Sequence, residues 1–247
     1  MVPIRHLQEA PIIEAVFDFR VKAAKDFSVE DFARVGQTLS SQFPKMDAAR
    51  GGQVRIDFRP GPPEVNTENL GLMGYFFKSE DEKLIAQFRI DGFTLNRLAP
   101  YTSWDELYPL ATRLWQQYCD VATPQTVTRL AVRYINKIPL PWTFVDFDDY
   151  LTAGPDVPSG LPQNVPAFLL QVQILDTDHY IAANVIQQLE SSLAEQKHSI
   201  VLDIDAFKAV DLSPSDPSIK DVFGQLRDFK NAIFFSYLTE EAIRRFE

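Results

Sequence analysis

The sequence predicts an α+β protein made of two similar halves, in which a curved antiparallel sheet carries its helices on one face in a helix-grip-like arrangement. Residues 16–35 and 130–151 share one order of features: an alternating strand with a basic residue at its end, a short connection, a pair of nearby phenylalanines and a short amphipathic helix. Each segment is followed by a proline-marked loop, several alternating strands and a longer amphipathic helix. The alternation leaves one face of the sheet polar, which an antiparallel sheet tolerates.

The two halves are assigned as residues 1–123, a β-α-β(4)-α repeat, and residues 124–247, a β-α-β(3)-α repeat, within one continuous globular unit. Both halves are long enough to contribute to a substantial core, because the chain has 247 residues of which 45% are hydrophobic.

The first half opens with a clean alternation over residues 13–21, which predicts a strand. Ser28 is a candidate N-cap for a short helix, with Phe27 and Phe32 placed as a hydrophobic staple. Ser103 opens a longer helix, and Asp91-Gly92 is a strong hairpin signal. The sequence predicts a break at Gly51-Gly52, a loop over 60–71, and further strands over 53–59, 72–78, 83–90 and 93–97.

The second half follows the same order of elements. Proline residues 139 and 141 end its first strand, and Thr239 is a candidate start for a separate terminal helix after the long one. The predicted elements are strands over 125–138, 167–175, 180–190 and 199–207, a short helix over 145–151, a proline-rich loop over 154–166 and a helical region over 218–246.

The polar face of this sheet is the candidate functional surface. As a structural surface, it is a solvated face held by cross-strand ion pairs, each contributing below about 1 kcal/mol. As a functional surface, it is a groove in which arginine forks bind carboxylates, phosphates or base edges. Its outward positions are Glu14, Asp18, Arg20, Arg55, Asp57, Arg59, Gln87, Arg89, Arg129, Arg133, Gln171, Gln173, Asp203 and Asp205, and the binding candidates among them are Arg20, Arg55, Arg59, Arg89, Arg129 and Arg133.

The first strands of the two halves are expected to meet antiparallel at the centre of the sheet. Antiparallel partners have residue numbers of constant sum, and a sum of 147 brings unlike charges together. In that register Glu14 pairs with Arg133 and Asp18 pairs with Arg129, so the four residues form a structural charge ladder.

Signals for catalysis or metal binding are weak, so we expect no catalytic residue, no metal site and no cofactor. His6, His179 and His198 lack metal-ligand spacing, and a turn cap is the simpler role for His179. The pair Asp203 and Asp205 lies on one strand face, as a Mg²⁺ site requires, but no further ligand accompanies it. The single Cys119 lies on an apolar helix face, which indicates a structural thiol.

The core side of the sheet offers a second, internal location for a ligand. Its many aromatic residues are compatible with a cavity of the kind that helix-grip folds enclose, although a filled core is the simpler interpretation. The polar residues that the pattern directs to this side are Asn136 and Tyr134.

The formal net charge of −10 bears on the partners of the protein. Residues 124–247 carry 10 basic and 17 acidic side chains, so most of the acidic excess is in the second half. A negative protein is repelled by nucleic acid and by anionic membranes, whereas a basic protein partner is favoured. No apolar run of signal-peptide or membrane-spanning length is present, which indicates a cytoplasmic location.

Two segments carry a resemblance to a known family. Ala10-Pro-Ile-Ile-Glu-Ala-Val-Phe-Asp-Phe-Arg20 and Arg129-Leu-Ala-Val-Arg-Tyr-Ile-Asn-Lys-Ile138 resemble the two signatures of a sporadically distributed, functionally uncharacterised bacterial family, with an Ala-Pro-Ile-x-Glu-Ala-Val start and a central Arg-Tyr-x-Asn-x-Ile motif. The resemblance implies patchy inheritance of the accessory or defence type and assigns no catalytic residue.

Two functions are therefore compatible with the sequence. The first is a non-catalytic binding or regulatory protein that recognises another, basic protein in an antitoxin-like, immunity-like or accessory-defence role. The alternative is an enzyme or sensor whose Arg20, Arg129 and Arg133 engage a phosphorylated small molecule or a nucleic-acid end. The oligomeric state is left open by the sequence.

Overall fold

The computed structural model describes residues 5, 7–57, 64–143, 146–192, 194 and 196–247, and for residues 53–57 and 64–68 it describes the backbone alone. Within this part of the chain, nine strands form one antiparallel sheet in the order β2-β3-β4-β5-β1-β6-β9-β8-β7. The protein therefore has an α+β fold, as the alternation predicted. The strands are β1 (Ile12–Lys22), β2 (Lys45–Asp57), β3 (Glu64–Lys78), β4 (Leu84–Arg89), β5 (Gly92–Leu98), β6 (Thr126–Leu140), β7 (Leu169–Asp176), β8 (Ile181–Ser192) and β9 (Lys197–Leu212).

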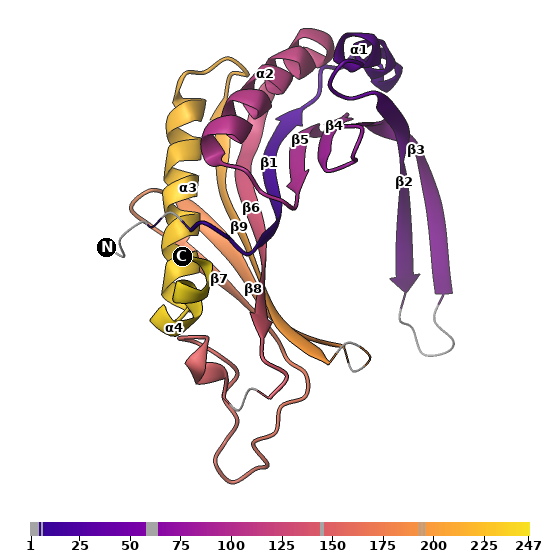
Figure 1. The fold of residues 1–247 in the computed structure, drawn as a ribbon. Coiled ribbons are helices and arrows are strands. Elements are labelled where there is room, and N and C mark those ends of the chain that lie inside the picture. Colours follow the sequence, from indigo (N-terminus) through magenta and orange to yellow (C-terminus); the bar gives the residue numbers. More distant parts are fainter. Residues whose placement is uncertain (1–4, 6, 58–63, 144–145, 193, 195) are drawn as a thin grey trace.

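The long helices pack on one face of the curved sheet (Figure 1). The helix α2 (Trp104–Ala122) contacts β5 and β1, whereas α3 (Ser218–Tyr237) contacts β9 and β6. The core between the two layers is rich in aromatic rings, and the ring of Phe19 stacks on that of Trp115 with their centroids 4.6 Å apart. The short helices are α1 (Phe32–Leu39), α4 (Glu240–Ile243) and the 3-10 turns Val29–Asp31, Phe147–Asp149 and Arg244–Phe246.

Three local signals at the starts of helices act as the sequence predicted, whereas the Ser28 hydroxyl caps no amide and donates to the Glu30 carboxylate instead. Ser103 caps α2, because its hydroxyl oxygen accepts a hydrogen bond from the amide of Glu106 at 3.2 Å. Thr239 caps the separate terminal helix α4 in the same way. The rings of Phe27 and Phe32 contact each other with centroids 4.8 Å apart, as a hydrophobic staple does.

Two boundaries in the first half differ from the sequence prediction. Gly51-Gly52 does not end a strand but lies within β2, where the pairing with β3 shifts register on either side of Gly51. The predicted loop over 60–71 is strand from Glu64 onward, since β3 begins there, and residues 58–63 lie outside the described part. Glycines favour a bulge as much as a break in a strand, so the local sequence did not separate the two.

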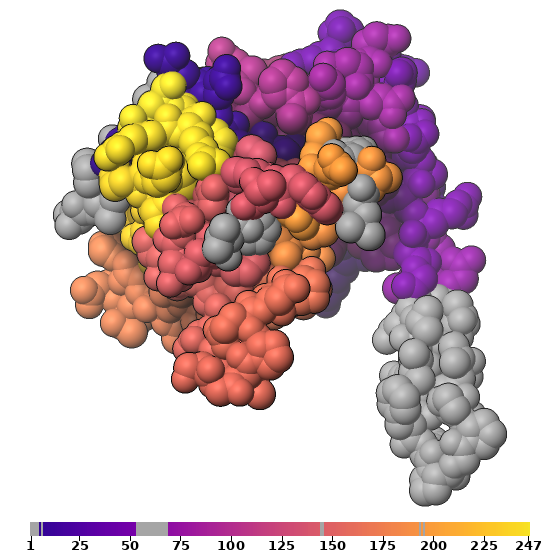
Figure 2. All heavy atoms as spheres, turned by 60° about the horizontal axis from the view of Figure 1, so that its bottom comes forward, coloured from indigo at the N-terminus to yellow at the C-terminus, as the bar shows by residue number. Residues whose placement is uncertain are grey.

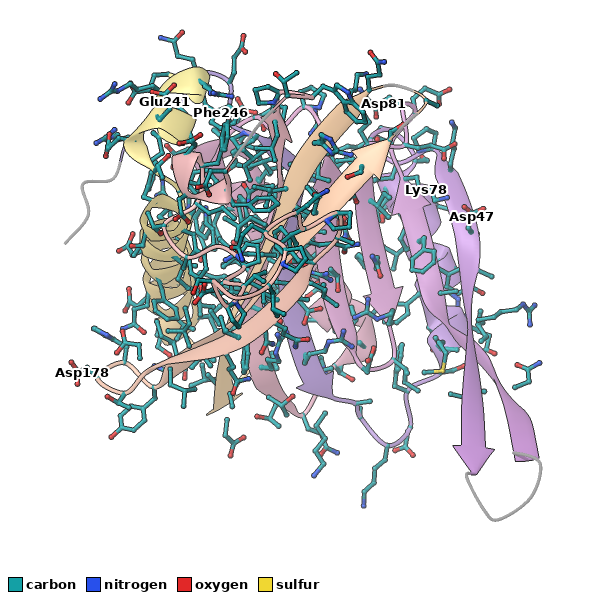
Figure 3. All side chains as sticks on the ribbon, turned by 90° about the horizontal axis from the view of Figure 1, so that it is seen from below. Asp47, Lys78, Asp81, Asp178, Glu241 and Phe246 are labelled. Carbon is teal, nitrogen blue, oxygen red and sulfur yellow. The ribbon has the colours of Figure 1, made fainter. Side chains whose placement is uncertain are left out.

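The two sheet edges lie on opposite sides of the molecule. Asp47 and Lys78 are ion-paired at 2.6 Å near the β2 edge, and Asp178 lies at the tip of the β7–β8 hairpin (Figure 3).

Two predictions for the second half are wrong in the described part: β6 continues through Pro139 to Leu140, and the short helix expected over 145–151 is only the 3-10 turn Phe147–Asp149. The segment 146–166 connects β6 to β7 and projects from the surface beside α4 and the β8–β9 turn (Figure 2).

Gly92 is a position where only glycine fits. Its φ is +150°, and an added Cβ would lie 2.1 Å from the carbonyl oxygen of Phe19 in the neighbouring strand. We expect Gly92→Ala to lower the free energy of unfolding by at least about 2 kcal/mol, because β1 and β5 would have to separate. Urea unfolding followed by circular dichroism measures this loss.

Gly224 provides the matched control, because it lies inside α3 with nothing within 4 Å of an added Cβ. Gly224→Ala is expected to stabilise the protein by about 0.5–1 kcal/mol through its higher helix propensity. Equal losses for the two variants would contradict the role given to Gly92.

Candidate functional site

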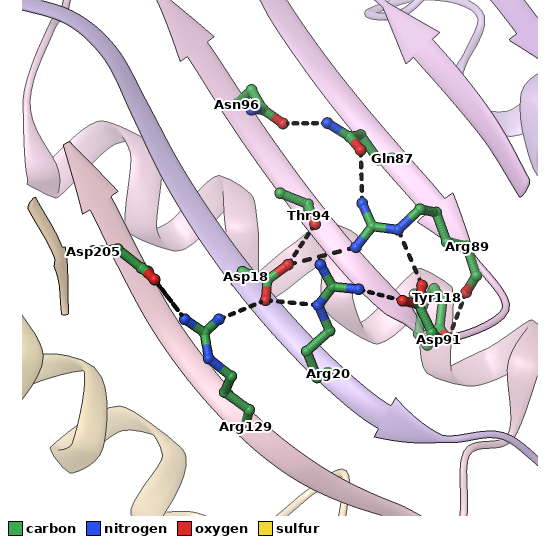
Figure 4. Close-up of polar contacts among 10 residues, drawn as sticks. All are labelled: Asp18, Arg20, Gln87, Arg89, Asp91, Thr94, Asn96, Tyr118, Arg129 and Asp205. Atoms are coloured by element: carbon green, nitrogen blue, oxygen red, sulfur yellow. Dashed lines mark hydrogen bonds and ion pairs between the residues drawn. The ribbon is translucent and has the colours of Figure 1, made fainter. Parts of the chain in front are cut away.

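Asp18 is the centre of an ion-pair network on the sheet face opposite the helices (Figure 4). One of its carboxylate oxygens accepts a hydrogen bond from the Thr94 hydroxyl at 2.7 Å. The other accepts from Arg20 Nε at 3.0 Å and from Arg129 Nη1 at 3.1 Å. Its side chain is only 11% exposed, although it lies on the polar face, because the arginine side chains cover it.

The network continues across five strands through further carboxylates and amides. Arg129 binds both oxygens of Asp205 on β9, at 3.0 and 2.8 Å, and its guanidinium lies over the ring of Phe207. Arg20 and Arg89 both bind Asp91, which follows β4. Figure 4 shows these links, together with the bond from the Tyr118 hydroxyl to the Arg89 carbonyl at 3.0 Å.

A second branch joins Arg89 to Glu14 through two amides. Arg89 Nη1 donates to Gln87 at 2.6 Å, Gln87 donates to Asn96 at 2.8 Å, and Asn96 donates to Glu14 at 2.6 Å. Each amide acts as donor and acceptor at once, which fixes its orientation. This branch therefore orders the side chains of β4, β5 and β1 on the same face.

The predicted meeting of the first and sixth strands at the sheet centre is confirmed, but the predicted register is wrong. Between Glu14 and Arg20 the partner numbers sum to 149, so Glu14 lies opposite Ile135 and Asp18 lies opposite Ala131. A shift of two residues keeps every side chain on its face, so hydrophobic alternation cannot distinguish the two registers. In the observed register, the pairing of β1 with β6 has a bulge at each end.

The charge ladder consequently has different partners from those predicted. The contact between Asp18 and Arg129 forms diagonally, whereas Glu14 binds Asn96 instead of Arg133. Arg133 pairs with Asp203, with its Nε at 2.8 Å, and this hydrogen bond raises the pKa of the guanidinium. Glu14, Asp18, Arg129 and Arg133 still line one shallow depression of about 510 Å³.

The remaining candidate residues are distributed as follows. Arg20 and Arg89 line the same depression, whereas the side chain of Arg55 and all of Arg59 lie outside the described residues. Asp203 and Asp205, the pair considered for Mg²⁺, are each bound by an arginine.

The charges on this face are nearly balanced. Arginine donors point at carboxylates throughout the network, so an incoming anion would have to displace a carboxylate. One buried donor, Arg89 Nη2, has no hydrogen bond to any described residue and lies 3.6 Å from Asp18. The arrangement is suited to holding five strands in register. Few of its arginine donors are left to bind an anion.

The histidine and cysteine side chains have structural surroundings. His179 lies in the β7–β8 turn, where its ring and its amide both bond to Asp176, and its side chain is exposed, as expected for a turn cap. Burial raises the pKa of Cys119 to about 12, so the thiol stays protonated at neutral pH. Within the described ranges, no three residues of the types His, Cys, Asp and Glu gather as metal ligands do.

The edge strand β7 is a surface that the sequence analysis did not single out. It pairs with β8 on one side, and no other described strand pairs with its outer edge. Leu169 and Leu175 are each 65% exposed and Val172 is 46% exposed, while residues 169–175 carry no charge.

A groove of about 880 Å³ leads to the start of β7. It is formed by the segment 146–166 and the ends of β8 and β9. Asp146, Asp148 and Asp156 line it, and the described lining contains no lysine or arginine. The exposed Trp142 also lines it, with its ring stacked on that of His198 at 4.4 Å between centroids.

Lys230 is the second feature that sequence reasoning missed. It lies in α3 and is only 8% exposed, because it occupies a core position of the helix. The spacing from Phe223 and Leu226, seven and four residues earlier, was a signal that could have found it. Phe229, the apolar residue before it, is only partly buried.

Comparison with known proteins adds no relative. A scan against protein-family models gives no match, and neither does a search of curated proteins. Among the described helices, none combines the length and the apolar composition needed to cross a membrane.

Proposed function

We propose that this protein is a non-catalytic binding or regulatory protein that recognises another protein, and that β7 accepts an extended segment of this partner. The observation that carries the proposal is the outer edge of β7, which no other described strand pairs with and which is uncharged over residues 169–175, with Leu169, Val172 and Leu175 exposed. A strand edge offers unpaired amide and carbonyl groups, and a peptide that adds to it gains main-chain hydrogen bonds.

The opposite edge of the sheet supports this assignment by contrast. On β2, Lys45 pairs with Glu82 and Asp47 pairs with Lys78, and register shifts interrupt the pairing with β3. Charges and bulges are the usual means by which a sheet edge avoids unwanted pairing. The two edges therefore differ, because β2 carries charged residues whereas residues 169–175 of β7 carry none.

The charges around β7 favour a basic partner. Asp146, Asp148 and Asp156 line the groove near the start of β7. Asp178 lies at the tip of the β7–β8 hairpin, after the end of β7. A segment with an apolar centre and basic flanks would match this pattern, and the net charge of −10 would speed its approach.

The alternative, an enzyme or sensor that binds a phosphorylated small molecule or a nucleic-acid end on the polar sheet face, is less favoured. Arg20, Arg129 and Arg133 would all have to leave their carboxylates to bind such a ligand. We therefore propose that the charge network is structural and that recognition occurs at β7.

The biological setting and the internal repeat belong to the same proposal. The resemblance in residues 10–20 and 129–138 favours a bacterial, cytoplasmic protein of the accessory-defence or antitoxin and immunity type.

The order of strands favours two copies of one unit. On one side of the central pair, β5, β4 and β3 follow β1, and on the other side β9, β8 and β7 follow β6. Superposition of residues 12–120 on 126–246 tests this, since elements that match out of order would contradict it.

The edge can be tested with a matched pair of lysine substitutions. We expect Val172→Lys to weaken partner binding at least about tenfold, because a buried charge in a strand pairing is unfavourable. Ala48→Lys on the exposed edge β2 is the control and should leave binding unchanged. The partner is first purified with the wild-type protein from the source cells, and cross-linking maps its contact before affinities are measured by calorimetry.

Two outcomes would overturn the proposal. In one, Val172→Lys binds the partner as tightly as wild type while cross-links map elsewhere. In the other, sedimentation shows that wild type is a dimer which Val172→Lys converts to a monomer, so that the occupant of β7 is a second copy of the chain.

A further inference from the structure

We propose that the pocket between the N-terminal segment, α2, β6 and α3 binds a small organic anion, whose carboxylate or phosphate group contacts Lys230 and Arg227 and whose apolar body packs on Phe234 and Phe235. The pocket has a volume of about 400 Å³ and lies on the helix side of the sheet. It is therefore separate from the Asp18 network and from β7, and the inference does not rest on the proposed protein-binding function.

Lys230 points into this pocket without an anionic partner. Its Nζ lies 3.8 Å from the centre of the Tyr134 ring, a cation–π contact. Among the described residues its ammonium has no ion pair and no hydrogen bond, although the residue is 8% exposed. A buried ammonium is unfavourable unless a carboxylate or another acceptor satisfies it.

Arg227 increases the need for an anion. It lies one turn before Lys230 on α3, with its guanidinium 5.1 Å from the centre of the Trp104 ring, and no described carboxylate forms an ion pair with it. Burial, together with the smaller effect of the Arg227 charge, lowers the pKa of Lys230 to about 7. Two cations on one pocket wall repel each other, and an anion between them would remove that repulsion.

The tyrosine hydroxyls of the pocket are neutral donors rather than competing anions. The hydroxyls of Tyr101 and Tyr134 lie 3.2 Å apart, and burial raises the pKa of both, so both remain protonated. The capped N-terminus of α2 at Ser103 also lines the pocket and favours negative charge.

One carboxylate lines the pocket, and it does not reach Lys230. Asp105 is exposed on the first turn of α2, and no ion pair joins it to either cation among the described residues. Arg5, the remaining cation of the lining, is already bound by Glu240 and Glu247. The unpaired positive charge of the pocket therefore comes from Lys230 and Arg227.

Apolar side chains make up much of the remaining lining, which limits the class of ligand. They include Ile12, Trp104, Phe234 and Phe235, and the uncharged polar side chains beside them are Gln8, Thr102, Ser103, Asn136 and Asn231. Small-molecule sites combine such an apolar surface with a few polar groups, and the volume is within their usual range of roughly 300–1,000 Å³. An aryl or alkyl carboxylate or phosphate matches both parts of the pocket.

The test uses three probes of one shape on the full chain. 4-Phenylbutyrate and 3-phenylpropyl phosphate carry the two head groups on the same phenylpropyl body, and 4-phenylbutyramide is a neutral isostere of the first. Isothermal titration calorimetry at pH 6.5 should show binding of one anion at least about tenfold tighter than the amide, equivalent to about 1.4 kcal/mol. The tighter of the two anions identifies the head group.

Variants then assign the binding to the pocket. Lys230→Met keeps the length and apolar packing of the side chain and should weaken anion binding at least about tenfold, while amide binding stays unchanged. Lys220→Met is the matched control, since Lys220 is an exposed residue of the same helix, and its affinity should equal that of wild type. Arg227→Gln is a second variant that should also weaken anion binding.

The inference is overturned if neither anion binds wild type more tightly than about 1 mM. It is equally overturned if the amide binds as tightly as the anions, or if Lys230→Met and Arg227→Gln both retain wild-type affinity. A negative result with these probes would not contradict the proposed function of β7, because the probes test the Lys230 pocket and Val172→Lys tests a different surface.

Discussion

Replacing Asp18 with alanine is expected to lower the free energy of unfolding by about 3 kcal/mol. The side chain of Asp18 is 11% exposed and neutralises Arg20 and Arg129, while Arg89 lies 3.6 Å away. Its removal leaves these guanidinium groups crowded at the sheet centre without the shared carboxylate. Because one partner of a buried network is removed while the others remain, the cost exceeds the net value of any single pair.

Two further variants separate charge from packing in this prediction. Asp18→Asn keeps the size of the side chain and should lose a similar amount, about 2–3 kcal/mol, if charge is the cause. Glu190→Ala is the control, because Glu190 and Lys137 form a pair in which both side chains are 45% exposed. Such a pair contributes below about 1 kcal/mol. Chemical denaturation at pH 7 measures all three, and a loss below about 1 kcal/mol for Asp18→Ala would show that the network is not a stabilising centre.

Replacing Lys230 with methionine is expected to stabilise the ligand-free protein by about 2–4 kcal/mol at pH 6, because it removes a buried, unpaired ammonium. The pKa of Lys230 is lowered from 10.5 to about 7 in the folded protein. The folded state therefore binds fewer protons than the unfolded state between these two values, and wild-type stability rises with pH across that interval. The cost of Lys230 is complete below pH 7 and vanishes above pH 10.5.

The advantage of Lys230→Met should consequently shrink as the pH rises from 7 towards 10.5. Other ionisable groups of the same pocket, namely Arg5, Tyr101, Asp105, Tyr134 and Arg227, are present in both proteins, so their effects largely cancel in the difference. Denaturation of both proteins at pH 6 and pH 9.5 measures the change. A pH-independent difference, or a less stable variant at pH 6, would contradict the unpaired state of Lys230.

Local sequence signals predicted much of the fold because they act over short distances. Ser103, Thr239 and the pair Phe27 and Phe32 mark helix starts through contacts within a few residues. Period-two alternation in β1 likewise assigns the faces of a strand from its own residues. The Asp91-Gly92 hairpin is confirmed, although the glycine lies in β5 rather than at the centre of the turn.

Partner choice among charged residues was not predictable in the same way. Glu14 and Arg133 are on the predicted face, yet Glu14 binds Asn96 and Arg133 binds Asp203. Registers that differ by two residues preserve both faces, so their energies differ only through packing of the particular side chains that meet. Those contacts join residues about 70 to 110 positions apart in the chain, and a pattern within one strand contains no information about them.

The sequence by itself determined the α+β class, the polar and apolar faces of the strands, the helix starts and the surplus of acidic residues in the second half. Only the tertiary structure decided that β7 is an edge with no further partner among the described strands, that Asp18 is covered by arginines, and that Lys230 faces a pocket without an ion pair to any described carboxylate. The physical reason is that propensity and periodicity depend on neighbouring residues, whereas burial of a charge depends on what distant elements bring to it. The same lysine on an exposed helix face would be an ordinary solvated side chain.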